Sequence, residues 1–169
     1  MTDDQGDGGD AVLVHRLAGE QALAHGHRLL DPTELAASCA TAGVDPERAV
    51  AALLALQDRR LVDVRTVGPA LVSQVRLTED GFVRYLTATR GDLEAVRSRV
   101  SATLCAEMEA GRLGAAIDLA GMVGEPALVV GVLLDRMRHR GEVVFTPVTG
   151  HRVRVHRIGP PPDRPLRAP

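Results

Sequence analysis

The same succession of predicted segments occurs twice in this chain, and this repeat restricts the fold more than any other feature. Each copy begins with a helix, continues with a short and then a longer helix, and ends in two extended stretches. In the first copy the segments span residues 11–29, 32–42, 45–60, 61–66 and 71–77. In the second they span 92–111, 115–123, 125–140, 141–145 and 151–158. Aligning Arg59 with Arg140 superposes the copies at an offset of 81 residues, so we expect two similar units.

Capping residues mark where several of these helices begin and end. Asp31 and Asp45 each precede a proline, and both pairs are typical of a helix start because aspartate caps free amides and proline suits the first turn. Thr78 is predicted to cap a further helix after the second strand. Gly141 ends the long helix of the second copy as a C-terminal cap.

One stretch of the first copy carries a specific resemblance. ELAASCATAGVDPERAVAALLALQDRRLVDV, followed by VRLTEDGFVRYL, resembles the winged helix-turn-helix superfamily. The end of the family's third helix is matched by Leu53, Leu56, Arg59, Arg60, Leu61 and Val62, and an LTxxG stretch after the wing is matched by Leu77, Thr78 and Gly81. Arg60 stands where the family usually has glycine, so it must adopt the helix-stop conformation that glycine favours.

The resemblance covers residues 11–90 and implies a mainly α fold with small β-wings (α+β). With the repeat, it predicts two tandem winged helix-turn-helix domains, over residues 11–90 and 91–158. An acidic leader over 1–10 and a Pro/Arg-rich tail over 159–169 are expected to be disordered, because both are rich in glycine or proline. A single winged-helix domain with a helical dimerisation arm is the alternative, and the strand-rich stretch at 142–158 counts against it.

The charge distribution limits the function. The net charge of −2 excludes a strongly basic nucleic-acid coat protein. All 20 Lys/Arg residues are arginines. Residues 1–10 carry −4, 11–90 carry 0, 91–150 carry −2 and 151–169 carry +4. The aromatic residues are Phe82, Tyr85 and Phe145 alone, too few for base stacking on a single strand.

The winged-helix resemblance implies binding to double-stranded DNA through the third helix and the wing of a domain. Arg48 is the side chain on the outward side of the first unit's third helix that can pair bidentately with guanine. Thr33 is a phosphate candidate at a helix start, and the arginines of the wings are backbone-contact candidates. The predicted DNA-binding residues are Thr33, Arg48, Arg65, Arg76, Arg152, Arg154 and Arg157. About four to six phosphates would be neutralised per chain, with a salt slope of roughly −4 to −5.

The corresponding helix of the second unit has a different character. EPALVVGVLLDRM is apolar around nearly its whole circumference, which is typical of a buried helix. Leu128, Val129 and Val132 are therefore predicted to contact the other domain, a second copy or a protein partner. Two functions follow: a DNA-binding transcriptional regulator, expected to be a homodimer, or a non-catalytic adaptor or complex subunit that binds proteins through winged-helix domains.

Other functional classes find little support in the sequence. The chain has no phosphate-binding loop of the GxxxxGK[ST] type and no GxSxG motif, so no enzyme, cofactor or metal site is expected. No apolar run is long enough to span a membrane, and the acidic N-terminus is unlike a signal peptide, so the protein is expected in the cytoplasm. Cys39 and Cys105 are expected as buried apolar fillers, with a redox-sensing pair as the alternative.

Overall fold

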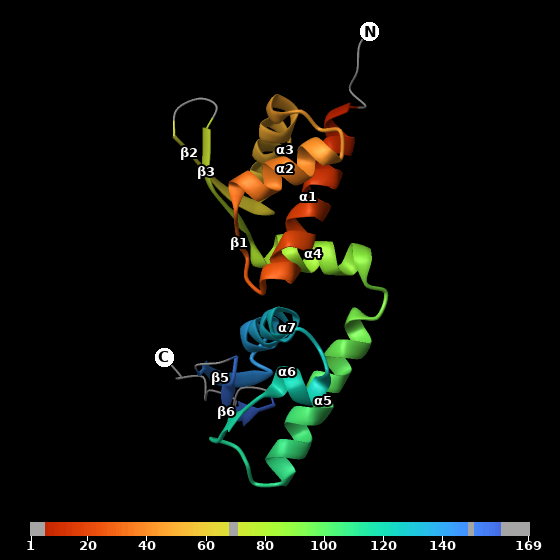
Figure 1. Ribbon diagram of the computed structural model, residues 1–169. Coiled ribbons are helices and arrows are strands. Elements are labelled where there is room, and N and C mark those ends of the chain that lie inside the picture. Colours follow the sequence, from red (N-terminus) through yellow and green to blue (C-terminus); the bar gives the residue numbers. More distant parts are fainter. Residues whose placement is uncertain (1–5, 68–70, 149–150, 160–169) are drawn as a thin grey trace, which may run out of the picture. The chain divides into compact units, whose positions relative to one another are not determined.

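The computed structural model describes residues 6–67, 71–148 and 151–159, and these form a mixed α+β structure (Figure 1). The described residues contain seven helices and two three-stranded antiparallel sheets. The chain divides into two compact units that meet between Gly91 and Asp92. Among the described helices, none combines the length and the hydropathy that a membrane span requires.

The first unit contains four helices and one sheet. Its elements are α1 (Gly6–His25), β1 (Leu29–Leu30), α2 (Pro32–Thr41), α3 (Pro46–Asp58), β2 (Val62–Val67), β3 (Leu71–Leu77) and α4 (Glu79–Thr89). The strand order is β1-β3-β2, so β3 lies in the middle of the sheet. The α1 helix packs against α2, α3 and α4.

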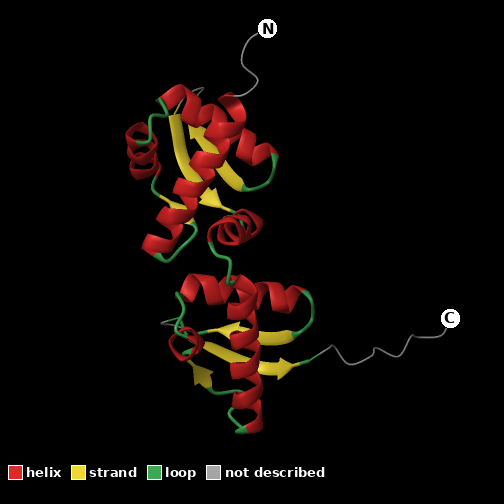
Figure 2. Ribbon diagram, turned by 90° about the vertical axis from the view of Figure 1, so that its right-hand side faces the viewer, coloured by secondary structure: helices red, strands yellow, loops and turns green. Residues whose placement is uncertain are grey.

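Over residues 92–148 and 151–159, its described part, the second unit repeats this order without a counterpart of α4. Its elements are α5 (Leu93–Glu109), β4 (Ala116–Ile117), α6 (Leu119–Val123), α7 (Ala127–His139), β5 (Val143–Pro147) and β6 (Val153–Ile158). The strand order is β4-β6-β5, the same arrangement as in the first unit, and Figure 2 shows the three strands of each sheet side by side. Within the described residues, the repeat seen in the sequence is therefore also a repeat of topology.

The predicted capping residues occupy the predicted helix starts. Oδ1 of Asp31 accepts hydrogen bonds from the amides of Thr33 (2.8 Å) and Glu34 (3.2 Å). Oδ1 of Asp45 accepts from the amide of Arg48 (2.9 Å), and Oγ1 of Thr78 accepts from the amide of Gly81 (2.9 Å). These bonds satisfy amides that have no partner within their helix, so they determine where α2, α3 and α4 begin.

Several boundaries differ from the sequence-based expectation. The helix expected over 11–29 ends at His25, and the strand expected over 141–145 spans Val143–Pro147. β1 and β4 were not predicted, because a strand of two residues has no periodicity and exists only through its pairing with β3 or β6. The helix expected over 115–123 is limited to α6, since Ala116 and Ile117 belong to β4. α1 begins at Gly6, so residues 6–10 are helical and do not belong to a disordered leader. Residues 160–169 of the predicted tail lie outside the described residues.

The core of each unit is made of aliphatic side chains. In the first unit the fully buried residues include Val14, Leu56, Leu77, Phe82 and Leu86. In the second, Val96, Val100 and Leu104 of α5 are fully buried, and α5 packs against α6 and β6. This stripe therefore belongs to the core of the second unit. Cys39 is buried and Cys105 is half-buried; both thiols are free.

The helix α4 approaches the start of β2 so closely that only glycine fits at Gly81. A Cβ atom there would lie 1.9 Å from the carbonyl oxygen of Leu61. The Thr78 hydroxyl donates to the carbonyls of Arg60 (2.9 Å) and Leu61 (3.0 Å), and the Nε2–H group of neutral His15 donates to the Gly81 carbonyl (2.8 Å). The LTxxG stretch thus joins α4 both to the end of α3 and to α1.

Arg60 and Gly141 provide a matched test of the helix ends. Arg60 has a φ of 59°, as the sequence required, and its counterpart Gly141 has a φ of 74°. Left-handed backbone is unfavourable for a residue with a Cβ atom. We expect Arg60→Gly to raise the free energy of unfolding by about 0.5–1 kcal/mol and Gly141→Ala to lower it by about 1 kcal/mol, measured by urea denaturation. Equal effects of the two substitutions would contradict the inference that left-handed backbone is unfavourable at Arg60 but not at Gly141.

The buried His15 predicts a loss of stability in mild acid. Burial lowers the pKa of its imidazole below the ordinary 6.5, and this exceeds the opposing effect of the hydrogen bond to Gly81. Below pH 6.5 the imidazole of His15 therefore binds a proton in the unfolded chain but stays neutral in the folded chain. The contribution of His15 to the free energy of unfolding is complete above pH 6.5 and declines as the pH falls through the lowered pKa. The slope should not exceed about 1.4 kcal/mol per pH unit. In His15→Gln, urea denaturation should show a smaller decline than in the parent protein.

Candidate nucleic-acid interface

The outer face of the first sheet carries two exposed arginines. The buried Val75 and Leu77 of β3 face the core, and alternation along the strand places Arg76 on the opposite face. Register pairs Arg76 with Asp63 and pairs Arg65 with Gln74, so these four side chains share one face of the β2–β3 hairpin. They border a hollow of about 360 Å³ that Gln57 also lines. Both Arg65 and Arg76 are exposed.

The second sheet presents a similar face. Arg154 lies on the central strand β6, between Ala116 of β4 and Thr146 of β5. His156, two residues along the same face, is hydrogen-bonded through Nε2 to the Thr146 hydroxyl (2.9 Å). Arg152, just before β6, is exposed. Side chains alternate along this strand, because Val153 and Val155 are buried while Arg154 and His156 are exposed.

Arg157 differs from its neighbours on β6. It lies opposite Val144 in register, is half-buried, and is already engaged in a contact. Its charge is therefore less available to an external anion than the charges of Arg152 and Arg154.

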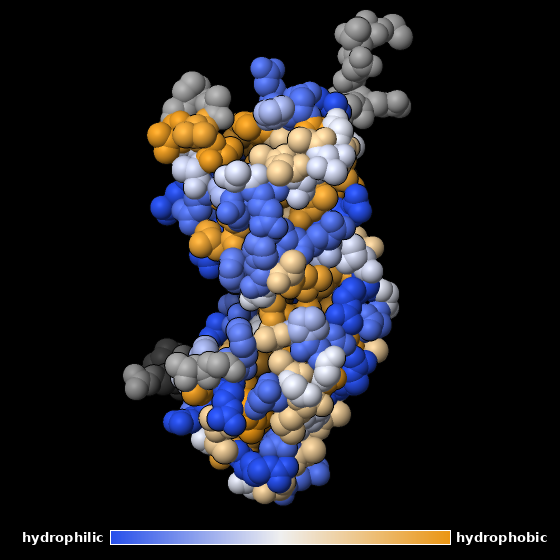
Figure 3. Space-filling model, in the orientation of Figure 1, coloured by the Kyte–Doolittle hydropathy of each residue, from blue (hydrophilic) through white to orange (hydrophobic). Residues whose placement is uncertain are grey.

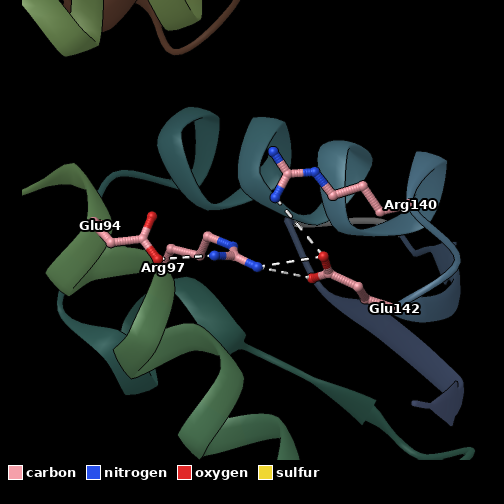
Figure 4. Close-up of polar contacts among 4 residues, drawn as sticks. All are labelled: Glu94, Arg97, Arg140 and Glu142. Carbon is pink, nitrogen blue, oxygen red and sulfur yellow. Dashed lines mark hydrogen bonds and ion pairs between the residues drawn. The ribbon is translucent and has the colours of Figure 1, made fainter. Parts of the chain in front are cut away.

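Seven other arginines of the described residues belong to ion pairs, while Arg59, Arg60 and Arg84 are exposed without one. The paired residues include Arg16, Arg48, Arg97, Arg99, Arg112, Arg138 and Arg140. Figure 4 shows one such cluster, in which Arg97 of α5 lies between Glu94 (2.8 Å) and Glu142 (3.2 Å), and Arg140 lies 3.8 Å from Glu142. The cluster joins α5 to the segment after α7, so its charges are used within the unit.

The strongest of these pairs links Arg112 to the buried Glu107. Two hydrogen bonds, of 2.6 and 2.7 Å, join the guanidinium to the carboxylate. They lower the pKa of Glu107 and raise that of Arg112, so both groups remain charged. An arginine held in this way closes the turn after α5 and does not contribute to an interface.

Arg65, Arg76, Arg152 and Arg154 are different: within the described residues, no ion pair involves any of them. A guanidinium that is exposed and unpaired can bind a phosphate bidentately without first breaking an internal contact. The hairpin of each unit thus presents two positive charges to solvent.

Arg48 is not free in this way. Its Nε and Nη2 atoms each donate a 2.7 Å hydrogen bond to the carboxylate of Asp10 in α1. The atoms needed for bidentate contact with guanine are therefore already occupied. The sequence contained Asp10, but nothing in its local pattern indicated that a residue 38 positions away would contact Arg48.

Thr33 is exposed in the first turn of α2, as predicted, but its surroundings do not favour an anion. The amides of Thr33 and Glu34 are both bound by the Asp31 carboxylate. A phosphate would meet that negative charge instead of free amides, so helix-start binding at Thr33 is not supported.

The predicted partner-binding residues of α7 do not form an open surface. Val129 is 0 % exposed and Val132 is 2 % exposed, while Leu128 is half-buried. Six residues of α7 are buried, which agrees with the all-round apolar pattern of the sequence. In this structure Val129 and Val132 are not accessible to an external molecule, and the contact of these residues with the other domain, a second copy or a protein partner stays a prediction.

Within the described residues, no group of three or more histidine, cysteine, aspartate or glutamate side chains could hold a metal ion. Comparison of the chain with protein-family models, with curated proteins and with solved structures found no match.

Proposed function

We propose that this protein binds double-stranded DNA as a regulator of transcription, through two tandem winged helix-turn-helix domains. The topology supports this proposal, because both units have the order helix, strand, helix, helix, strand, strand, and in both the last strand lies in the middle of the sheet. In that fold the third helix of a unit lies in the major groove and the hairpin follows the DNA backbone.

The observation that carries the proposal is that each hairpin, over its described residues, bears two exposed arginines without an ion pair. Arg65 and Arg76 in the first unit, and Arg152 and Arg154 in the second, are exposed, and within the described residues none of them has an ion-pair partner. Elsewhere in the described residues seven arginines neutralise carboxylates, whereas Arg59, Arg60 and Arg84 are also exposed without an ion pair. Phosphate contact by the hairpins would give moderate, salt-dependent affinity with little sequence preference.

Sequence preference would have to come from α3, where Arg48 has the required donors; the amide oxygen of Gln57, the other candidate, already accepts a hydrogen bond from the Val64 amide (2.9 Å). Asp10 competes for those donors, so base contact needs the Asp10–Arg48 pair to open. The Arg48 side chain is 52 % exposed but the Asp10 side chain is 13 % exposed, so opening the pair leaves a largely buried carboxylate without its cation.

A protein-binding adaptor is the second candidate, and the exposed side of α3 favours it. That side carries Glu47, Ala51, Asp58 and the 45 % exposed Leu54, a set that suits a protein surface better than phosphates. The adaptor predicts no affinity for DNA at low salt, so one binding experiment separates the two functions.

Removal of the hairpin arginines tests the DNA-binding proposal. We expect Arg65→Ala/Arg76→Ala and Arg152→Ala/Arg154→Ala each to weaken binding to a labelled random-sequence duplex and to reduce the salt slope by about 2, since each phosphate contact contributes about 0.9. Fluorescence anisotropy between about 50 and 200 mM salt measures both quantities.

The matched control is Arg16→Ala/Arg84→Ala, which removes the same charge from exposed positions of α1 and α4. It should leave the slope nearly unchanged. Absence of binding by the parent protein at low salt, or an equal loss in the control, would reject the proposal and favour the adaptor.

Asp10→Asn tests the role of Arg48. Loss of the competing carboxylate frees the guanidinium, so we expect tighter binding to the duplex, by a factor of about 3 to 10. Arg48→Ala should weaken binding and also reduce discrimination among duplexes of different sequence. If Asp10→Asn and Arg48→Ala change affinity in the same direction, the pair stabilises the unit and has no part in DNA contact.

A further inference from the structure

A cleft of about 310 Å³ lies between α2, α3 and β3 in the first unit. Leu35, Ala36 and Cys39 line it from α2, Val50 and Leu53 from α3, and Val72 from β3. These walls come from three regular elements, with α2 packed against both α3 and β3. The cleft therefore has a defined shape that does not depend on a loop.

The cleft contains no charged side chain among its lining residues, and Thr33 supplies its one hydroxyl group. Burial raises the pKa of the Cys39 thiol, so this group stays protonated and uncharged. Leu71 lies at the edge of the cleft and is 64 % exposed, and its register partner Val67 is 63 % exposed. Figure 3 shows the resulting apolar patch at the end of the β2–β3 hairpin.

The second unit has a cleft at the corresponding place, with a different chemistry. It measures about 280 Å³, and Gly131, Leu134 and Val153 line it at the repeat positions of Val50, Leu53 and Val72. Asp135, His151 and Arg152 also line it, and Arg152 occupies the repeat position of Leu71. The fold thus produces the gap in both units but does not require an apolar lining. The lack of charge in the first cleft is a property of its own residues.

We propose that the cleft of the first unit is a binding site for a small, uncharged, mainly hydrocarbon molecule. Its volume is at the lower end of ligand pockets, about 300–1,000 Å³, and suits a molecule of one or two rings. A charged ligand would lose its hydration without gaining a partner, because no lining side chain can pair with it. Apolar surface at the edge extends the contact area that such a molecule buries. The inference does not rest on DNA binding.

The test uses 6-propionyl-2-(dimethylamino)naphthalene, a neutral two-ring probe whose fluorescence changes in apolar surroundings. Ala36 lines the cleft and is exposed, while the adjacent Ala37 is exposed and does not line it. Ala36→Trp and Ala37→Trp therefore make the same change inside and outside the site. We expect saturable binding of one probe per chain to the parent protein and to Ala37→Trp, and at least about tenfold weaker binding to Ala36→Trp.

A second variant keeps the proposal testable if Ala36→Trp does not fold. Leu71→Arg places at the edge of the cleft the residue that the second unit has there, at a position already exposed to solvent. It should weaken the binding of the probe without changing the circular dichroism spectrum of the protein. Failure of the probe to saturate, equal binding by Ala36→Trp and Ala37→Trp, or binding that occurs only with doubling of the molecular mass would overturn the proposal. The last result would identify a second copy as the occupant.

Discussion

The alternation of side chains along the central strand of each sheet is the constraint on which the rest of the structure depends. β3 pairs with strands on both sides, and burial of Val75 and Leu77 on one face leaves Arg76 on the other. β6 repeats this with Val153 and Val155 buried and Arg154 exposed. A shift of the strand register by one residue would bury guanidinium groups and expose the apolar core. The burial of apolar side chains that stabilises the sheet therefore also positions the arginines.

Ion pairing then separates the arginines into two groups. Seven of those on helices and turns neutralise carboxylates, as Arg97 does between Glu94 and Glu142, and Arg112 does at Glu107. Those on the outer faces of the hairpins keep their charge exposed. A chain with a net charge of −2 can therefore still present local positive surfaces, because the carboxylates that balance the sum lie beside other arginines.

The two units share their topology and differ in the residues that line equivalent places. Arg60 and Gly141 both end a long helix in the left-handed region, at different conformational cost. Leu71 and Arg152 occupy the same repeat position at the edge of the cleft, which leaves one cleft apolar and the other charged. Similar backbones with different linings are consistent with two units that have separate binding roles.

Local patterns in the sequence determined the order of the helices, their starts at Asp31, Asp45 and Thr78, the repeat, and the outward face of β6. These depend on residues close together in the chain, where capping and periodicity operate. Tertiary structure alone decided that β1 and β4 form and that Asp10 pairs with Arg48. Each of those outcomes joins residues from different elements, and no local pattern specifies which side chains or strands will meet once the elements pack.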